Sequence, residues 1–213
     1  MVIAGLRTLA VAVLSTLVVA GCGGSGYTYH SNRDENLYFK LPDDWTVFDG
    51  DDIPTDALTP GMWVRGFMAG EEPSVDGVFA LAAAEPRGFV FVEPLDVMER
   101  DTVSLRSLRG TLLGTDATGE PLDPLAYAEQ FPEQLQILGY DGGVVYDHGP
   151  HGVHLRVAIS PPGEETAVID QLVLVDAGTS RMYVLSIGCS LECFEAHERE
   201  IEEVIDSWTL EAT

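Results

Sequence analysis

The hydrophobic and polar positions of the chain alternate in short runs that are typical of β-strands. Residues 38–41 and 45–48 flank a Pro-Asp-Asp turn and predict a β-hairpin. The segments GPHG, SPPGEE and DAGTS between later runs consist of turn-forming residues, which favours antiparallel pairing. The further runs predict strands over residues 62–68, 78–84, 89–93, 143–148, 153–159, 166–175 and 181–188.

Two segments have the longer period of a helix. Asp123 and Pro124 are typical of a helix start and predict a helix over residues 124–138, bent or broken near Pro132. After Ser190, a suitable N-cap, a C-terminal helix places one apolar face toward the sheet. That face consists of Leu191, Phe194, Ile201, Val204, Ile205 and Trp208. Residues 94–123 fit either helix or strand. Antiparallel strands with a few helices predict the α+β class, with about six to eight strands in a mostly antiparallel sheet.

The first 22 residues have the organisation of a lipoprotein signal. An apolar run over residues 9–20 has the length of a signal-peptide core and is too short for a membrane span. It ends in Val-Ala-Gly-Cys22, which resembles the bacterial lipobox, where small residues admit the peptidase and the cysteine thiol is alkylated. An ordinary cleaved signal and an N-terminal anchor helix are the alternatives.

The lipobox predicts the organisation of the whole chain. We expect a signal peptide over residues 1–21, acylation of Cys22, a flexible tether over residues 22–36 and one globular domain over residues 37–213. Acyl chains would hold the protein on the extracytoplasmic face of the cell membrane.

The chain is strongly acidic, with a net charge of −24. Nucleic acid and anionic lipid headgroups are therefore poor partners. Solubility of an exposed protein or a salty habitat accounts for the acidity. Cation binding is a weaker interpretation, because the acidic residues are scattered rather than clustered in a ligand loop.

The remaining two cysteines stand four residues apart in CSLEC. An extracytoplasmic location favours a disulfide between Cys189 and Cys193. A redox-active pair is the functional alternative, since a helix N-terminus lowers the pKa of a thiol. The spacing is CxxxC rather than CxxC, and no thioredoxin-like pattern surrounds it. Free thiols are the third possibility.

Several of these features together resemble the PsbP-like lipoproteins of Gram-positive actinobacteria. They are the lipobox, the opening YFKLPDDW at residues 38–45, the strand–Cys–helix from residue 184 and the closing DSWT at residues 206–209. The resemblance spans residues 37–211 and implies an antiparallel sheet between helices, an α/β/α sandwich. The family includes the photosystem II extrinsic subunit and a nuclear-import factor, so it also implies binding or assembly rather than catalysis. Trp45, Trp63 and Trp208 are interpreted as packing residues.

Candidate chemistry is sparse along the chain. The sequence contains no GxSxG, HExxH, P-loop or GxGxxG motif. Asp147, His148, His151 and His154 form one local cluster, which we interpret as polar residues of an exposed hairpin, with metal binding as the alternative.

The function predicted from the sequence is that of a non-catalytic binding or assembly module of the cell envelope. The membrane is one partner, through the acyl anchor, and a protein or a small molecule is the other. We expect no cofactor and no catalytic residue. An envelope enzyme, either redox-active through CxxxC or hydrolytic through a triad without a sequence motif, is the alternative.

Overall fold

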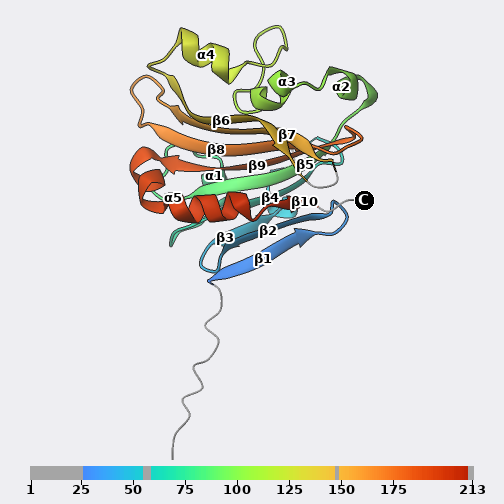
Figure 1. Cartoon of the computed structure of the whole chain (residues 1–213). Helices are drawn as coiled ribbons and strands as arrows, with labels where there is room; N and C mark the ends of the chain where they lie inside the picture. The colour runs from blue at the N-terminus through green and yellow to red at the C-terminus, as the bar shows by residue number, and fades with distance from the viewer. Residues whose placement is uncertain (1–25, 55–58, 147–148, 211–213) are drawn as a thin grey trace, which may run out of the picture.

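The computed structural model describes residues 26–54, 59–146 and 149–210, which form two antiparallel sheets with helices around them (Figure 1). The predicted signal peptide, Cys22, Asp147 and His148 lie outside these ranges. The small sheet has the order β1-β2-β10, and the large sheet has the order β3-β4-β5-β9-β8-β7-β6. Within the described ranges, no helix is long and apolar enough to cross a membrane. The α+β class with a mostly antiparallel sheet is confirmed.

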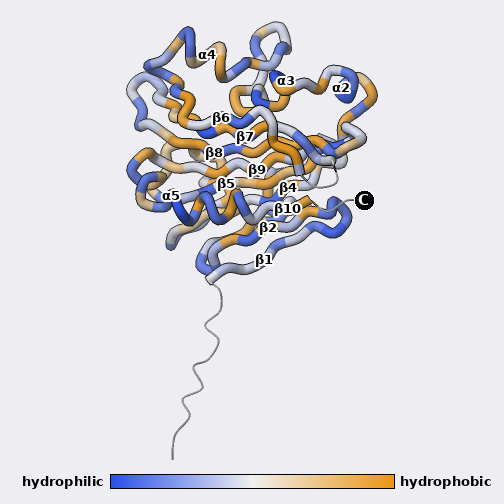
Figure 2. The backbone as a smooth tube through the Cα atoms, viewed as in Figure 1, coloured by the Kyte–Doolittle hydropathy of each residue, from blue (hydrophilic) through white to orange (hydrophobic). Residues whose placement is uncertain are grey.

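The strands of the large sheet follow the apolar runs of the sequence. Figure 2 shows hydrophobic residues concentrated along its central strands, and every residue of β8 is buried. The small sheet consists of β1 (Tyr27–Asn32), β2 (Leu37–Pro42) and β10 (Thr209–Leu210). The large sheet consists of β3 (Thr46–Asp49), β4 (Trp63–Met68), β5 (Arg87–Pro94), β6 (Leu135–Val145), β7 (His151–Ile159), β8 (Ala167–Val175) and β9 (Arg181–Ser190).

Helices cover both faces of the large sheet. The long helix α5 (Leu191–Asp206) packs with the small sheet against one face, and its N-cap is Ser190, whose hydroxyl accepts a hydrogen bond from the Cys193 amide. The short elements α2, α3 and α4 lie over the opposite face (Figure 1). The shorter helical elements are η1 (Gly50–Asp52), α1 (Val75–Val78), α2 (Val97–Thr102), α3 (Leu105–Gly110) and α4 (Pro124–Gln130).

The main core lies between the two sheets and α5. Phe39 of β2, Phe67 of β4 and Ile201 of α5 are fully buried there, and Trp208 closes the core beneath β10. Trp45 stacks on Phe67 with ring centroids 5.8 Å apart. The packing role predicted for these two tryptophans therefore agrees with their burial.

The predicted hairpin over residues 38–48 is wrong in its pairing. β2 pairs with β1 and β10, whereas β3 pairs with β4 in the other sheet. The turn between them, in which the Trp45 amide donates to the Pro42 carbonyl over 3.1 Å, is a corner between the sheets. The corner places β2 in one sheet and β3 in the other, and the main core lies between these two sheets.

The end of the predicted tether belongs to the fold. Residues 27–32 form β1, which pairs with the whole of β2. The side chain of His30 stacks on Phe39 with centroids 5.5 Å apart, so β1 covers the edge of the core. β1 contains few apolar residues, because only one of its faces lies against the core. The sequence pattern therefore does not predict this strand.

Two further predictions are corrected between residues 75 and 145, and one segment left open between helix and strand is assigned. Residues 78–84 are irregular after α1, not a strand, and residues 94–123 contain α2 and α3. The helix predicted over residues 124–138 ends at Gln130, because Pro132 follows, and the chain continues as β6 from Leu135. β6 has two register irregularities against β7, which remove the strict alternation that would reveal a strand.

Candidate functional site

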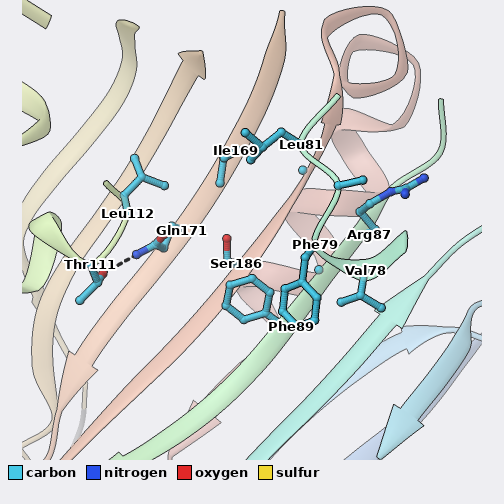
Figure 3. Close-up of a pocket in the computed structure, with 13 residues that line it drawn as sticks. Val78, Phe79, Leu81, Arg87, Phe89, Thr111, Leu112, Ile169, Gln171 and Ser186 are labelled. Carbon is cyan, nitrogen blue, oxygen red and sulfur yellow. Dashed lines mark hydrogen bonds between the residues drawn. The ribbon is translucent and has the colours of Figure 1, made fainter. Parts of the chain in front are cut away.

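An apolar cleft opens on the sheet face opposite α5 (Figure 3). Its floor consists of β5, β9 and β8, one wall is the segment after α1, and the other wall is the end of α3. The cleft has a volume of about 140 Å³. The side chains that Figure 3 labels around it are Val78, Phe79, Leu81, Arg87, Phe89, Thr111, Leu112, Ile169, Gln171 and Ser186.

The floor of the cleft is low because small residues occupy its centre. Gly88, Ser186 and Gly188 lie side by side on β5 and β9, with Phe89 and Ile169 beside them. At Gly88 the strands approach so closely that a Cβ atom would lie 2.2 Å from the Ser186 carbonyl oxygen. On the cleft side, the small residues Ser186 and Gly188 of β9 leave space that Phe89 and Ile169 border.

One wall is attached to the floor by Arg87. Its guanidinium donates hydrogen bonds to the Gly77 carbonyl over 2.6 Å and to the Glu85 carbonyl over 3.3 Å. These bonds hold the irregular segment after α1 over the sheet. Phe79 and Leu81 of this segment are about half exposed, at 47% and 49%. The rim of the cleft thus presents apolar surface to solvent.

Two polar groups lie in the floor and the opposite wall. The Gln171 side-chain amide donates to the Thr111 hydroxyl over 2.6 Å, which joins β8 to the end of α3. The Ser186 hydroxyl has no hydrogen-bond partner among the described residues, and Figure 3 shows it in the floor of the cleft. It is available to a bound polar atom.

The size and lining of the cleft define what it can accept. A dry apolar cavity of about 150 Å³ holds one benzene ring in a model protein. The cleft of 140 Å³ therefore has room for one aromatic ring or one branched aliphatic group. Among its lining residues Arg87 is the one ionisable side chain, and burial lowers the pKa of Arg87 against the opposing effect of Glu85, which does not line the cleft.

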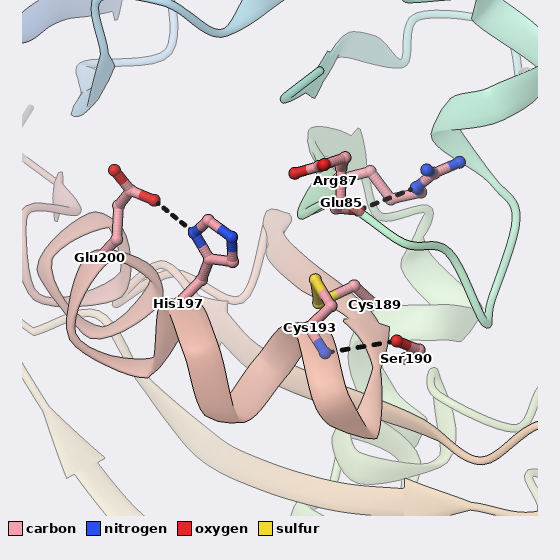
Figure 4. The surroundings of a disulfide bond; sticks show 7 residues. All are labelled: Glu85, Arg87, Cys189, Ser190, Cys193, His197 and Glu200. Carbon is pink, nitrogen blue, oxygen red and sulfur yellow. Dashed lines mark hydrogen bonds and ion pairs between the residues drawn. A yellow bond between two sulfur atoms is a disulfide. The ribbon is translucent and has the colours of Figure 1, made fainter.

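The cysteines of CSLEC are joined at the corner between β9 and α5 (Figure 4). The Cα atoms of Cys189 and Cys193 are 5.9 Å apart, and the two residues are 0% and 5% exposed. The bond fixes the first turn of α5 to the end of β9. Contact with an external thiol requires exposure that neither sulfur-bearing residue has. Leu191 beside it is 42% exposed, so its predicted place on the buried face of α5 is wrong.

The predicted histidine cluster is divided by the strand that carries it. His151 and His154 both lie on β7, and an odd separation of three places them on opposite faces. His151 is exposed and contacts the Gly149 carbonyl over 3.2 Å. In the described part of the chain, no group of three His, Cys, Asp or Glu side chains is placed to hold a metal ion. His148 lies outside that part, so its role stays a prediction.

His154 belongs instead to a buried ionic network. Its Nε2 lies 2.5 Å from Oδ1 of Asp170, which is 0% exposed. Arg156 donates to the other carboxylate oxygen over 2.8 Å and reaches Glu198 and Glu202 of α5 at 3.1 Å each. The hydrogen bond with Asp170 raises the pKa of His154 against the opposing effect of burial. The network attaches β7 and β8 to α5.

Neither the cleft nor this network is predicted from the sequence. Asp170 was the available signal, because a single acid inside AVIDQLVLV must be paired if that strand is buried. The cleft has no local signal, since its floor and walls come from segments far apart in sequence. Trp63, the third predicted packing tryptophan, is partly buried beneath Arg65, with the guanidinium carbon 5.5 Å from the ring centroid.

No protein-family model matches the chain, and no curated protein matches it in sequence. Several solved structures are similar in fold. Cyanobacterial PsbP from Synechocystis sp. PCC 6803 is 14% identical, with 91% of this chain and 99% of that chain covered and a TM-score of 0.47. The Saccharomyces cerevisiae Ran-binding protein Mog1p is 14% identical, with 86% and 95% covered and a TM-score of 0.45.

A mycobacterial envelope protein is also among the similar structures. LpqN, involved in cell envelope biogenesis of Mycobacterium tuberculosis, is 12% identical, with 86% of this chain and 89% of that chain covered and a TM-score of 0.41. Identities and TM-scores this low leave the site to be judged from the residues of this chain.

Proposed function

We propose that this protein is a PsbP-like envelope lipoprotein, anchored through Cys22, that acts as a non-catalytic binding or assembly module. The cleft of Figure 3 would receive one apolar group of a protein or small-molecule partner. The observation that carries the proposal is an open apolar recess on a sheet face that helices otherwise cover. Its lining suits shape-based recognition, with the Ser186 hydroxyl as one polar contact.

Two observations favour binding over the enzyme alternative. A redox-active pair needs an accessible thiolate, whereas the Cys189–Cys193 bond is buried. A triad hydrolase needs a nucleophile hydrogen-bonded to its base. Among the described residues, no serine, threonine or cysteine side chain is hydrogen-bonded to a histidine.

The cleft is tested with indole as a probe for an aromatic ring. Methyl NMR spectra of Leu81, Leu112 and Ile169 should shift saturably, with a Kd in the millimolar range, about −4 kcal/mol. Ser186→Leu should weaken binding at least about tenfold by filling the floor, since 1.4 kcal/mol corresponds to a factor of ten. Ser186→Ala leaves the space and removes only the hydroxyl, so it should weaken indole binding by no more than the value of one hydrogen bond, about 1 kcal/mol or roughly fivefold. The cleft would be rejected as the site if Ser186→Leu bound indole as tightly as the wild type. It would also be rejected if the wild type showed no saturable binding.

The anchor is tested in cells by metabolic labelling with an alkyne fatty acid. The wild-type protein should carry the label and fractionate with membranes. Cys22→Ala should lose both, because acyl chains contribute about 0.8 kcal/mol per buried CH₂ to membrane attachment. Label that persists in Cys22→Ala would contradict the lipobox assignment.

A further inference from the structure

The small sheet begins very close to the proposed acylation site. The Gly26 carbonyl accepts a hydrogen bond from the Asp43 amide over 2.9 Å, and β1 starts at the next residue. Three residues separate Cys22 from Gly26, and the four residue steps between their Cα atoms span at most about 14 Å when extended. An acylated Cys22 would therefore hold the start of β1 within that distance of the lipid.

One surface of the small sheet carries amphipathic side chains at this place. Alternation and the Tyr29–Lys40 register put Tyr27, Tyr29, Tyr38 and Lys40 on the outer face, while Phe39 points into the core. We term these four residues the tyrosine face. Tyr29 is 77% exposed, and the Lys40 ammonium lies 4.4 Å from the Tyr27 ring centroid. Lys40 is the single lysine of the chain.

The composition of the tyrosine face suits the boundary between lipid and water. Tyrosine has an apolar ring and a polar tip, which is why it is enriched at the headgroup level of membranes. Lysine extends its ammonium toward phosphate from an apolar stem. Burial and the hydrogen bond with Glu203 raise the pKa of Tyr27 to about 12, so its ring stays neutral.

The charge around the tyrosine face selects the kind of membrane. Lys40 lies 3.6 Å from Glu203. Glu200 and Arg199 are also near Tyr27, so two acids offset the two local cations. With a net charge of −24 on the chain, an anionic surface would repel the domain. The matching surface is a zwitterionic or neutral one.

We infer that the tyrosine face lies against the headgroups of the membrane that holds the acyl anchor, an inference that rests on the proposed lipid attachment at Cys22. In Figure 1 the small sheet forms the outermost layer on one side, and α2, α3 and α4 lie on the opposite side. A domain of this size is about 40 Å across. Because the link to the acylated cysteine spans at most about 14 Å, the domain cannot rotate far enough for that opposite side to face the lipid. The helices that border the cleft thus point away from the membrane.

The test uses the acylated mature protein in phosphatidylcholine vesicles with one spin label. Cys189 and Cys193 are bonded and Cys22 carries the acyl chains, so an introduced cysteine reacts alone. Ser31→Cys reports from the tyrosine face of β1, and Asp101→Cys on α2 is the matched control; both residues are exposed. Collision with a water-soluble nickel chelate is measured by power saturation.

The expected result is a protection at residue 31 that residue 101 lacks. On vesicles, nickel access at Ser31→Cys should fall about threefold or more relative to the unacylated Cys22→Ser protein, as expected at headgroup depth. Adding Tyr29→Ser and Tyr38→Ser should restore access, with circular dichroism to show that the fold persists. Equal nickel access at residues 31 and 101 in protein shown by mass spectrometry to be acylated would overturn this inference alone. Absence of the acyl mass would instead reject the proposed anchor.

Discussion

Removal of the Asp170 carboxylate is expected to destabilise the fold strongly. Asp170 is fully buried, and it pairs with His154 on one oxygen and with Arg156 on the other. Asp170→Ala would leave both partners without their acceptor. Removing one member of a buried ion pair costs about 3–5 kcal/mol. Glu198 and Glu202 still contact Arg156, and its side chain is partly exposed, so we expect about 3 kcal/mol.

The assay is urea unfolding followed by circular dichroism at pH 6. At this chain length a loss of 3 kcal/mol corresponds to a Tm lower by about 6–12 °C. The double variant Asp170→Leu with Arg156→Met serves as the control, because an apolar replacement of the whole pair is often neutral. It should recover most of the loss. A loss of unfolding free energy below about 1 kcal/mol in Asp170→Ala would refute this reasoning, because a loss that small is typical of a surface ion pair and not of a buried one.

Three further predictions concern pH, backbone packing and the disulfide. The pKa of His154 is raised, so its contribution to the free energy of unfolding is fully present below pH 6.5 and is lost as the pH rises through the folded-state pKa. The difference in unfolding free energy between the wild type and His154→Gln, measured by urea titration, should therefore narrow from pH 5.5 to pH 8.5. A difference that widens with pH would contradict the assignment. Gly88→Ala should cost about 3 kcal/mol, since its Cβ meets backbone at 2.2 Å, while Gly139→Ala, whose nearest contact is 3.7 Å, should cost less than about 1 kcal/mol in the same titration. The Cys189–Cys193 disulfide closes only a short loop, so its reduction should lower the free energy of unfolding by about 2 kcal/mol. The Tm measured by calorimetry should fall by about 4–8 °C with the domain still folded. Complete unfolding on reduction would refute this.

The sequence predicts those elements whose neighbours are local or whose pattern is strict. β7, β8 and β9 alternate or are apolar throughout, and Ser190 marks the start of α5, so these lie within a few residues of their predicted bounds. The strand predicted from residue 143 coincides with the end of β6, whereas the part from residue 135 is not predicted, because the register irregularities disturb the alternation. Pro132 indicates only roughly where the preceding helix ends.

Pairing and the site depend on contacts that a local pattern does not contain. The Pro42–Trp45 turn has the composition of a hairpin turn, yet it connects two sheets. In this arrangement Trp45 packs on Phe67, a contact that the local sequence does not indicate. Likewise, Ser186 and Phe79 become neighbours in the cleft only after β5 has paired with β9. A single sequence therefore indicates which residues are apolar and leaves open which of them border a shared space.

The pairing of β10 with β2 has a consequence for the order in which the chain folds. Tyr38 and Leu37 pair with Thr209 and Leu210, so the small sheet joins the two ends of the domain. It can be completed only after almost the whole chain has been synthesised and residues 209–210 are available to pair with β2. Until then, Leu37, Phe39 and Leu41 lack their final cover in the main core. Contacts of such long sequence separation also slow folding, to the range of milliseconds to seconds. The N-terminal strands would thus be the earliest to be synthesised and among the last to be protected from proteases and chaperones.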